Sequence, residues 1–157
     1  MAKTTPLVGI LVGSASDLPV IEQAGAILEK FDVPHEILVK SAHRNPDEVD
    51  EYARTAEERG IQVIICGAGM AAHLAGAVAA RTMLPVIGVP IAAKNMDGMD
   101  ALLSTVQMPR GIPVATVAVD GAVNAAILAA QILAVEDEDL RVRLRRFKDD
   151  LGGGLKL

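Results

Sequence analysis

The sequence is poor in cysteine, aromatic residues and positive charge. Of its 157 residues one is cysteine, none is tryptophan, and aromatic side chains make up 2%. The single cysteine, Cys66, excludes an internal disulfide, fits a reducing compartment and is expected to pack as a small buried hydrophobe. Because hydrophobic residues still account for 51% of the chain, the core must be built from Ala, Val, Ile and Leu.

The chain also lacks an unbroken apolar segment that could cross a bilayer. Its only long uncharged stretch, residues 61–80, is interrupted by Gln62, His73 and three glycines, so we expect no contact with membranes. The formal net charge of −5 offers no basic face to nucleic acid, and a small-molecule partner is expected instead. No basic and then apolar leader opens the chain, which predicts a cytoplasmic protein.

Five short apolar runs alternate with amphipathic or alanine-rich segments. The runs are rich in β-branched residues and mostly lack polar alternation, which is typical of strands buried on both faces of a parallel sheet. Strands are expected at residues 7–12, 36–39, 63–66, 86–89 and 114–119, and helices at 17–31, 46–59, 71–81, 98–107 and 122–134. This order predicts a doubly wound, flavodoxin-like α/β domain with three α/β/α layers, spanning residues 1–157 as a single domain.

One more helix is expected outside this repeat, at residues 136–151. Leu140, Leu144 and Phe147 recur there at helical spacing, and three glycines follow. Residues 61–135 hold only six charged side chains, too few to coat the solvent-facing helices of a small monomer. We therefore expect other subunits to cover much of this surface, and the C-terminal helix to pack on a neighbouring subunit.

Polar and glycine-rich loops follow the first three strands, at residues 13–17, 41–46 and 67–73. Ligands bind to doubly wound sheets beyond the carboxyl ends of the strands, so these loops are predicted to meet in one pocket. The first loop places hydroxyl groups at a helix entrance, where free N–H groups favour a phosphate. Asp17 has two interpretations that stay open here: it caps the helix, or it accepts hydrogen bonds from a sugar diol.

The second loop carries the most chemical information. Asn45 followed by Pro46 forms a helix start that is complete by itself, which leaves Ser41, His43 and Arg44 for other work. Arginine binds phosphate through paired hydrogen bonds, and serine can add a hydroxyl donor. An imidazole can take up and return a proton at neutral pH. The alternative is a surface histidine beside a surface arginine, and the convergence of three polar loops weighs against it.

In the third loop, Gly67 and Gly69 allow a flat ligand to approach the backbone closely. They do not form a dinucleotide fingerprint, which would follow the first strand and continue to a third glycine. His73 is placed in the first turn of the predicted helix, where a structural histidine is the commoner case. The loops contain no metal-ligand spacing, nucleophile elbow, Walker lysine or Schiff-base lysine. We expect no cofactor and no metal, and a chemistry of proton transfer and positioning.

Taken together, the motifs closely resemble those of the class I phosphoribosylaminoimidazole carboxylase catalytic subunit (PurE) family, the 5-carboxyaminoimidazole ribonucleotide mutases of bacterial purine biosynthesis. The resemblance runs from about Val8 to the helix ending near Leu151. It rests on G-S-x-S-D at 13–17, S-A-H-R-x-P at 41–46, G-A-G-x-A-A-H-L at 67–74, L-P-V-I-G-V-P at 84–90, S-T-V-Q-M-P-R-G-I-P at 104–113 and N-A-A-I-L-A-A-Q-I-L at 124–133. Met70 and Ala75 stand where the family usually has glycine and proline.

The resemblance implies a carboxyl shift on a ribonucleotide substrate, from an exocyclic nitrogen to a ring carbon, without metal, biotin or ATP. His43 would be the general acid and base, and His73 a second catalytic residue. The implied substrate-binding positions are Ser14, Ser16, Asp17, Ser41, Ala42, Arg44, Gly67, Ala68, Gly69, Ala71 and Leu74. The family also implies a homo-octamer, and a transient contact with the ATP-dependent carboxyaminoimidazole ribonucleotide synthetase is a further expectation.

Two other functions are kept as alternatives. The family's other branch adds free CO2 directly to aminoimidazole ribonucleotide, and it typically lacks the A-A-H-L signature found here at residues 71–74. A nucleotide-binding α/β module without catalysis would need the three loops but no proton carrier. Turnover of the carboxyamino ribonucleotide separates the mutase from both.

Overall fold

The computed structural model describes residues 5–157, so the part of the leader prediction that concerns residues 1–4 lies outside the described residues. Its strands are β1 (Val8–Val12), β2 (His35–Val39), β3 (Val63–Gly69), β4 (Val86–Ile91) and β5 (Ala115–Thr116). Its helices are the short 3-10 helix η1 (Ala15–Asp17), α1 (Leu18–Lys30), α2 (Pro46–Thr55), α3 (Leu74–Ala79), α4 (Met99–Val106), α5 (Ala122–Leu133) and α6 (Glu138–Gly152).

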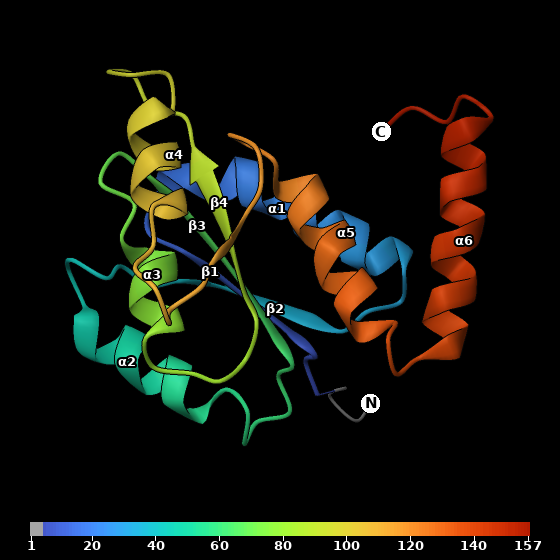
Figure 1. Cartoon of the computed structure of the whole chain (residues 1–157), viewed down its shortest axis with the longest axis horizontal. Helices are drawn as coiled ribbons and strands as arrows, with labels where there is room; N and C mark the ends of the chain where they lie inside the picture. Colours follow the sequence, from blue (N-terminus) through green and yellow to red (C-terminus); the bar gives the residue numbers. More distant parts are fainter. Residues whose placement is uncertain (1–4) are drawn as a thin grey trace.

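The five strands form one parallel sheet in the order β2-β1-β3-β4-β5. This is the flavodoxin-like order, in which the chain reverses its direction of travel across the sheet between β1 and β3. Figure 1 shows α2, α3 and α4 on one side of the sheet, α1 and α5 on the other, and α6 beyond α5. The predicted α/β class, the five-stranded sheet and the extra C-terminal helix are confirmed.

Two apolar layers hold the helices on the sheet. Alternate residues of the central strands point to opposite faces, so that Ile65 packs in the layer with α1 and α5 whereas Ile64 packs in the layer with α2 and α3. Alanines of α5, including Ala126 and Ala130, are fully buried against α1. Their small side chains let the two helices approach closely, which is how a core almost without aromatic rings fills its volume.

The burial of one strand and the extents of two other elements differ from the sequence prediction. Strand β2 lies at the sheet edge and is only partly buried, because β1 is its one neighbour in the sheet. Only Ala115 and Thr116 form β5; beyond them the chain keeps scattered bonds to β4, such as Val117 N–H to the Gly88 carbonyl. Helix α2 ends at Thr55, four residues before the predicted end.

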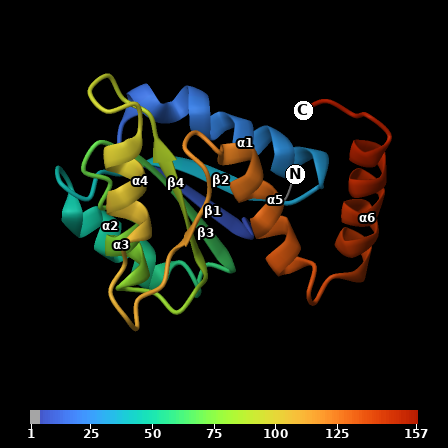
Figure 2. The ribbon, with the colours of Figure 1, turned by 45° about the horizontal axis from the view of Figure 1, so that its top comes forward.

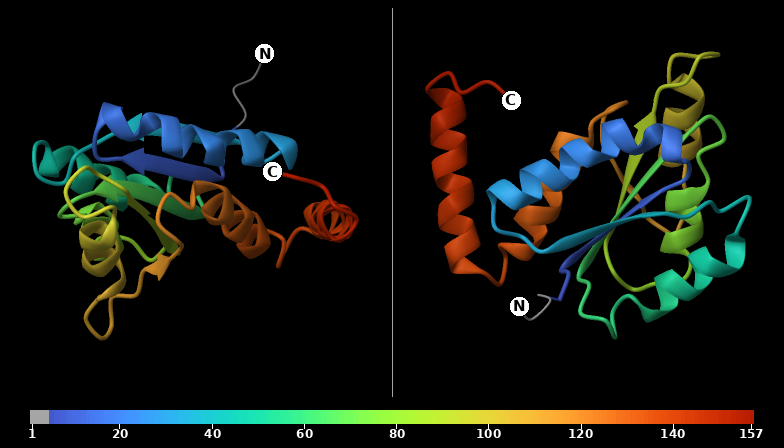
Figure 3. Two further views of the ribbon diagram at one scale, coloured as in Figure 1. Left: turned by 90° about the horizontal axis from the view of Figure 1, so that it is seen from above. Right: turned by 180° about the vertical axis from the view of Figure 1, so that it is seen from behind.

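Helix α6 stands at one end of the molecule in every view (Figures 2 and 3). Asp137 is its N-cap residue, and the Asp137 carboxylate accepts a hydrogen bond from Leu140 N–H at 2.9 Å. Its buried face packs on its own chain. There the rings of Phe147 and Phe31 lie edge to face, with their centroids 5.2 Å apart. Arg143 adds a hydrogen bond to the Phe31 carbonyl. Within residues 5–157, no helix combines the length and apolar character that a bilayer crossing requires.

A buried tyrosine ties α2 to the sheet at the end opposite the three loops. Tyr52 is 4% exposed, and its hydroxyl donates to Glu36 at 2.8 Å. Arg59 pairs with the same carboxylate and lies over the Tyr52 ring, 5.0 Å from its centroid. Burial, and next the bond to Glu36, raise the pKa of the Tyr52 phenol, so it stays protonated. The ring fits because residue 9 on β1 is glycine.

The substitution Gly9→Ala tests this packing. A Cβ at residue 9 would lie 2.0 Å from the Tyr52 hydroxyl oxygen. We therefore expect the free energy of unfolding to fall by about 1–3 kcal/mol, the usual cost of overpacking a filled core. Thermal unfolding followed by circular dichroism measures the loss. Gly152→Ala is the matched control, because nothing lies within 4 Å of its added Cβ. Adding Tyr52→Phe to Gly9→Ala removes the clashing oxygen, and failure to recover any stability would contradict this account.

Candidate active site

The loops after β1, β2 and β3 meet at the carboxyl edge of the sheet and enclose an open cavity of about 470 Å³. This is the edge at which the strand order reverses, the usual ligand position in a doubly wound sheet. The cavity is lined by Gly13, Ser14, Ser16, Asp17, Ser41, Ala42, His43, Arg44, Ala68, Gly69, Met70, Ala71, His73, Leu74 and Ala93.

All but one of the residues expected at the site line this cavity. The exception is Gly67, which lies within β3; its carbonyl accepts Gly13 N–H at 3.0 Å, and an added Cβ would lie 2.4 Å from the Ile21 side chain. Its smallness therefore serves the packing below the cavity. Three lining residues were not among the predicted substrate contacts: Gly13 and Met70, whose loops were expected at the pocket, and Ala93. Ala93 follows β4 at the same sheet edge, which was a positional signal, but its methyl side chain gave no chemical one.

In the first loop, the Ser14 hydroxyl caps η1 by accepting from Ser16 N–H at 3.4 Å and Ser16 Oγ–H at 2.9 Å. Asp17 occupies the N-cap position of α1, but its carboxylate makes no capping hydrogen bond. Among residues 5–157, its one hydrogen-bonding neighbour is the Ser16 hydroxyl, 3.3 Å away, whose single proton is directed to the nearer Ser14 oxygen at 2.9 Å. The Asp17 carboxylate therefore stays available to a ligand that donates hydrogen bonds.

The second loop is closed by its own side chains. Asn45 is the N-cap residue of α2 but makes no capping bond; its side-chain oxygen accepts Ser41 N–H at 2.8 Å, so the expectation of a self-contained helix cap is wrong. The buried Ser41 hydroxyl accepts Arg44 N–H at 3.2 Å and still has its own proton to donate. The Arg44 side chain crosses to the first loop, where it donates to the Gly13 carbonyl at 2.5 Å.

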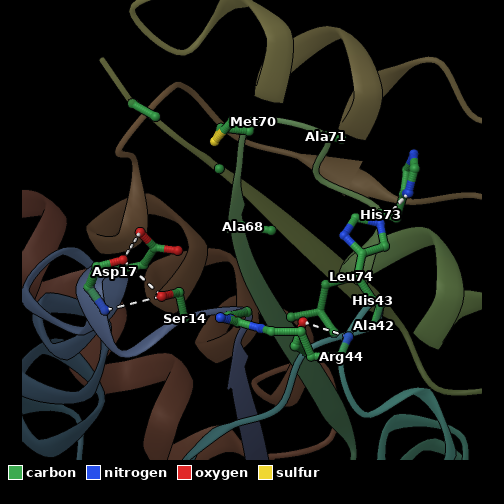
Figure 4. A pocket seen from close by; sticks show the side chains of 15 residues that line it. Ser14, Asp17, Ala42, His43, Arg44, Ala68, Met70, Ala71, His73 and Leu74 are labelled. Carbon is green, nitrogen blue, oxygen red and sulfur yellow. Dashed lines mark hydrogen bonds between the residues drawn. The ribbon is translucent and has the colours of Figure 1, made fainter. Parts of the chain in front are cut away.

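Two histidines from different loops are in direct contact. His43 Nε2 and His73 Nδ1 are 2.6 Å apart, and the rings stand nearly perpendicular with centroids 4.8 Å apart. A hydrogen bond of this kind needs one protonated and one unprotonated nitrogen, so the contact holds one proton between the rings. Figure 4 shows the rings at one end of the cavity, with Arg44 reaching toward Ser14 and Asp17 at the other.

The third loop reaches His73 through an irregular segment. Met70 has a φ of 54°, a left-handed conformation that is uncommon outside glycine. His73 is the N-cap residue of α3, which begins at Leu74. The expectation that His73 lies inside the first helical turn is therefore wrong, because residues 71–73 remain outside the helix.

The reactive groups at the cavity are proton carriers and hydrogen-bonding groups. Cys66 lies nearby on β3 but is 1% exposed, and burial raises the pKa of its thiol, which keeps it in the unreactive protonated form. Among residues 5–157 no group of three or more metal-ligating side chains is found. The arrangement can bind an anion at Arg44 and Ser14 and exchange a proton with a ligand at the histidine pair.

Comparison with known proteins places this geometry in context. Residues 7–152 match the model of the AIR carboxylase family. The N5-carboxyaminoimidazole ribonucleotide mutase of Pyrococcus abyssi is 58% identical over 93% of this chain and 84% of its own length. The mutase of Thermotoga maritima is 56% identical over 92% of this chain and 84% of its own length. The crystal structure of Treponema denticola PurE superimposes with a TM-score of 0.86 at 29% identity, covering 94% of this chain and 92% of that one.

Proposed function

Because this chain belongs to the AIR carboxylase family, we propose that its cavity binds and rearranges the nucleotide of the mutase reaction. The chain acts as an N5-carboxyaminoimidazole ribonucleotide mutase in purine biosynthesis, as do its relatives at 56–58% identity. The reaction moves a carboxyl group from the exocyclic nitrogen of the substrate to ring carbon C4. One observation carries the assignment of the site: the histidine pair shares a single cavity with Ser14, Asp17 and Arg44.

Arg44 and Ser14 are proposed to hold the substrate phosphate. The guanidinium already lies beside the first loop, where its bond to the Gly13 carbonyl fixes the side chain across the cavity (Figure 4). A guanidinium offers five donors, so several remain for phosphate oxygens. The hydroxyls of Ser14, Ser16 and Ser41 are further donors within the same cavity.

Asp17 is proposed to accept hydrogen bonds from the ribose hydroxyls. Its carboxylate lines the cavity and is free of a capping bond. A carboxylate accepts hydrogen bonds but repels phosphate, so the sugar is the part of the nucleotide that it suits. Asp17 occupies the N-cap position predicted from the sequence, but its carboxylate makes no capping hydrogen bond, which leaves it for the second interpretation, the sugar diol.

His43 is proposed to carry the proton through both halves of the reaction. The imidazolium first protonates the carbamate nitrogen, and the N–C bond breaks to release CO2 and the free amine. The electron-rich C4 carbon of the ring then attacks CO2 and forms the new C–C bond. Neutral His43 removes the proton left on C4, which restores aromaticity and the imidazolium. Atoms and charge balance, and neither a cofactor nor an external base is consumed.

His73 is proposed to keep that proton at hand between the two transfers. Its contact with His43 couples the tautomers of the two rings, because the shared hydrogen bond allows one proton between Nε2 and Nδ1.

The remaining wall of the cavity is apolar, which suits released CO2, a small uncharged molecule. Ala42, Ala68, Ala71 and Leu74 contribute apolar surface, and Gly69 leaves room for a flat ring. CO2 released beside these groups meets few polar side chains that would draw it away, so recapture by C4 competes well with escape.

We propose that the chain assembles as a homo-octamer in the cytoplasm, with residues 1–157 as one domain. Apolar side chains stand exposed along α4 and the loop before it, including Met96, Met99 and Leu103, where a monomer would expose them to water. A groove of about 330 Å³ between α5 and α6 offers a second surface for a neighbouring subunit. A native mass of eight chains would support this assembly. A transient contact with the ATP-dependent synthetase stays a prediction that no described feature tests.

An assay without ATP or bicarbonate tests the function. With neither present, the carboxyamino ribonucleotide should convert to the 4-carboxy product. In a second assay, isotopically labelled bicarbonate added at low concentration should not enter the product. Rapid incorporation of the label would instead indicate the direct carboxylase. Tight nucleotide binding without turnover would indicate a binding module.

Substitution of His43 tests the proton carrier. His43→Asn should lower kcat by at least about a hundredfold, the usual contribution of a positioned general acid and base, while nucleotide affinity stays within about tenfold because the role lies in the transition state. Stopped-flow kinetics and isothermal titration with the product measure the two quantities. A variant that retains kcat would refute this role for His43.

Substitution of Arg44 separates binding from chemistry. Arg44→Ala should weaken nucleotide binding by about 1.5–3 kcal/mol, the value of a lost charged hydrogen bond. Titration with the product measures the affinity. Arg54→Ala is the control, because this arginine of α2 pairs with Asp50 on the protein surface and does not line the cavity. Equal affinity in the two variants would argue against a phosphate contact at Arg44.

A further inference from the structure

Helix α4 reaches the active-site loop through one side chain, that of Ser104. Its hydroxyl oxygen accepts Ala72 N–H at 3.0 Å and lies 3.3 Å from the Met70 carbonyl. Within its own helix the same hydroxyl lies 2.7 Å from the Asp100 carbonyl. Ser104 does not line the cavity.

The distances fix the direction of these bonds. A serine hydroxyl has one proton, and the nearest acceptor is the Asp100 carbonyl one helical turn back. The oxygen lone pairs are then turned toward Ala72 N–H. The result is a chain of hydrogen bonds from Ala72 N–H through the Ser104 hydroxyl to the Asp100 carbonyl, in which each bond strengthens the next.

Ala72 needs this partner. It is 2% exposed, and among residues 5–157 its N–H has no other acceptor. A buried N–H without a partner is costly, so the loop would move to find one if the hydroxyl were lost. No helix or strand includes residues 70–73, because β3 ends at Gly69 and α3 begins at Leu74.

The same segment sets the place of His73. Met70 is left-handed, and His73 N–H bonds to the Ala71 carbonyl at 2.9 Å, so the chain turns tightly between them. A shift of Ala72 would move His73, its neighbour in the chain, and lengthen the 2.6 Å contact with His43.

We propose that Ser104 is a positioning residue for the mutase reaction, which holds the loop at Ala72 and thereby keeps His73 in contact with His43. It acts through His73 and touches neither substrate nor reacting atoms. The inference rests on the proposed function of the histidine pair, and it adds to the site a residue of α4 that lies outside the cavity.

The experiment compares Ser104→Ala, Ser104→Thr and Thr82→Ala in the full-length chain. Thr82 is the matched control, because its hydroxyl also accepts a loop N–H, that of Leu84 at 3.1 Å, but outside the cavity. Ser104→Ala should lower kcat about 10- to 100-fold, the range expected when a catalytic group is displaced by about an ångström, with KM within about threefold. Ser104→Thr keeps the hydroxyl and should retain at least about half of kcat.

Two further readouts separate positioning from general stability. Hydrogen exchange by mass spectrometry should show faster exchange in the peptide that contains Ala72 for Ser104→Ala only, and the pH profile of kcat should shift in that variant but not in Thr82→Ala. Unchanged kcat or unchanged exchange in Ser104→Ala would overturn the proposal. So would equal losses in Ser104→Ala and Ser104→Thr, because shape rather than the hydroxyl would then matter.

Failure of the proposed function gives a different result. A wild-type chain that does not turn over the carboxyamino ribonucleotide refutes the mutase assignment and the catalytic part of this inference with it. Faster exchange at Ala72 in Ser104→Ala would then still establish that Ser104 holds the loop.

Discussion

The reversal of strand order between β1 and β3 is the constraint on which the site depends. From β1 the chain enters α1 on one face of the sheet, and from β3 it enters α3 on the opposite face. The loops therefore diverge above the two central strands, and side chains from the β2 loop reach into the space between them. The cavity follows from the topology itself, because helices that leave a parallel sheet on opposite faces leave a space between them at its carboxyl edge.

Glycines on the strands let side chains of the helices pack close to the sheet. Gly67 admits the Ile21 side chain beneath the cavity, Gly88 admits Thr105 of α4 against β4, and Gly9 admits the Tyr52 ring at the far end of the sheet. In each case the space left by a missing Cβ is filled by a side chain from a helix. Glycines on the strands thus make room for side chains of the helices. The layer below the cavity is therefore tightly packed, although the cavity itself is open.

Features that depend on neighbouring residues or on a general rule of the fold could be predicted from the sequence. Individual contacts between distant residues could not. Strand and helix order came from local periodicity, and the meeting of Ser14, Arg44 and His43 followed from the rule that ligands bind at the carboxyl ends of such strands. Both His43 and His73 were expected at the site, but their direct contact was not predicted, because that rule brings loops together without showing which side chains touch. The late start of α3 was missed because Ala72 N–H bonds to Ser104, a partner 32 residues away that local periodicity does not reveal. Strand β5 was predicted too long because apolar composition does not show where pairing with β4 stops.

The two-residue length of β5 also bears on how copies of the chain can meet. A long exposed edge strand offers a row of unpaired backbone groups to which another chain can add a strand, the usual start of sheet-to-sheet aggregation. Ala115 and Thr116 offer almost no such row at that edge. Association through this side of the molecule is thereby left to helix and loop surfaces, whose side chains can discriminate among partners as backbone groups cannot.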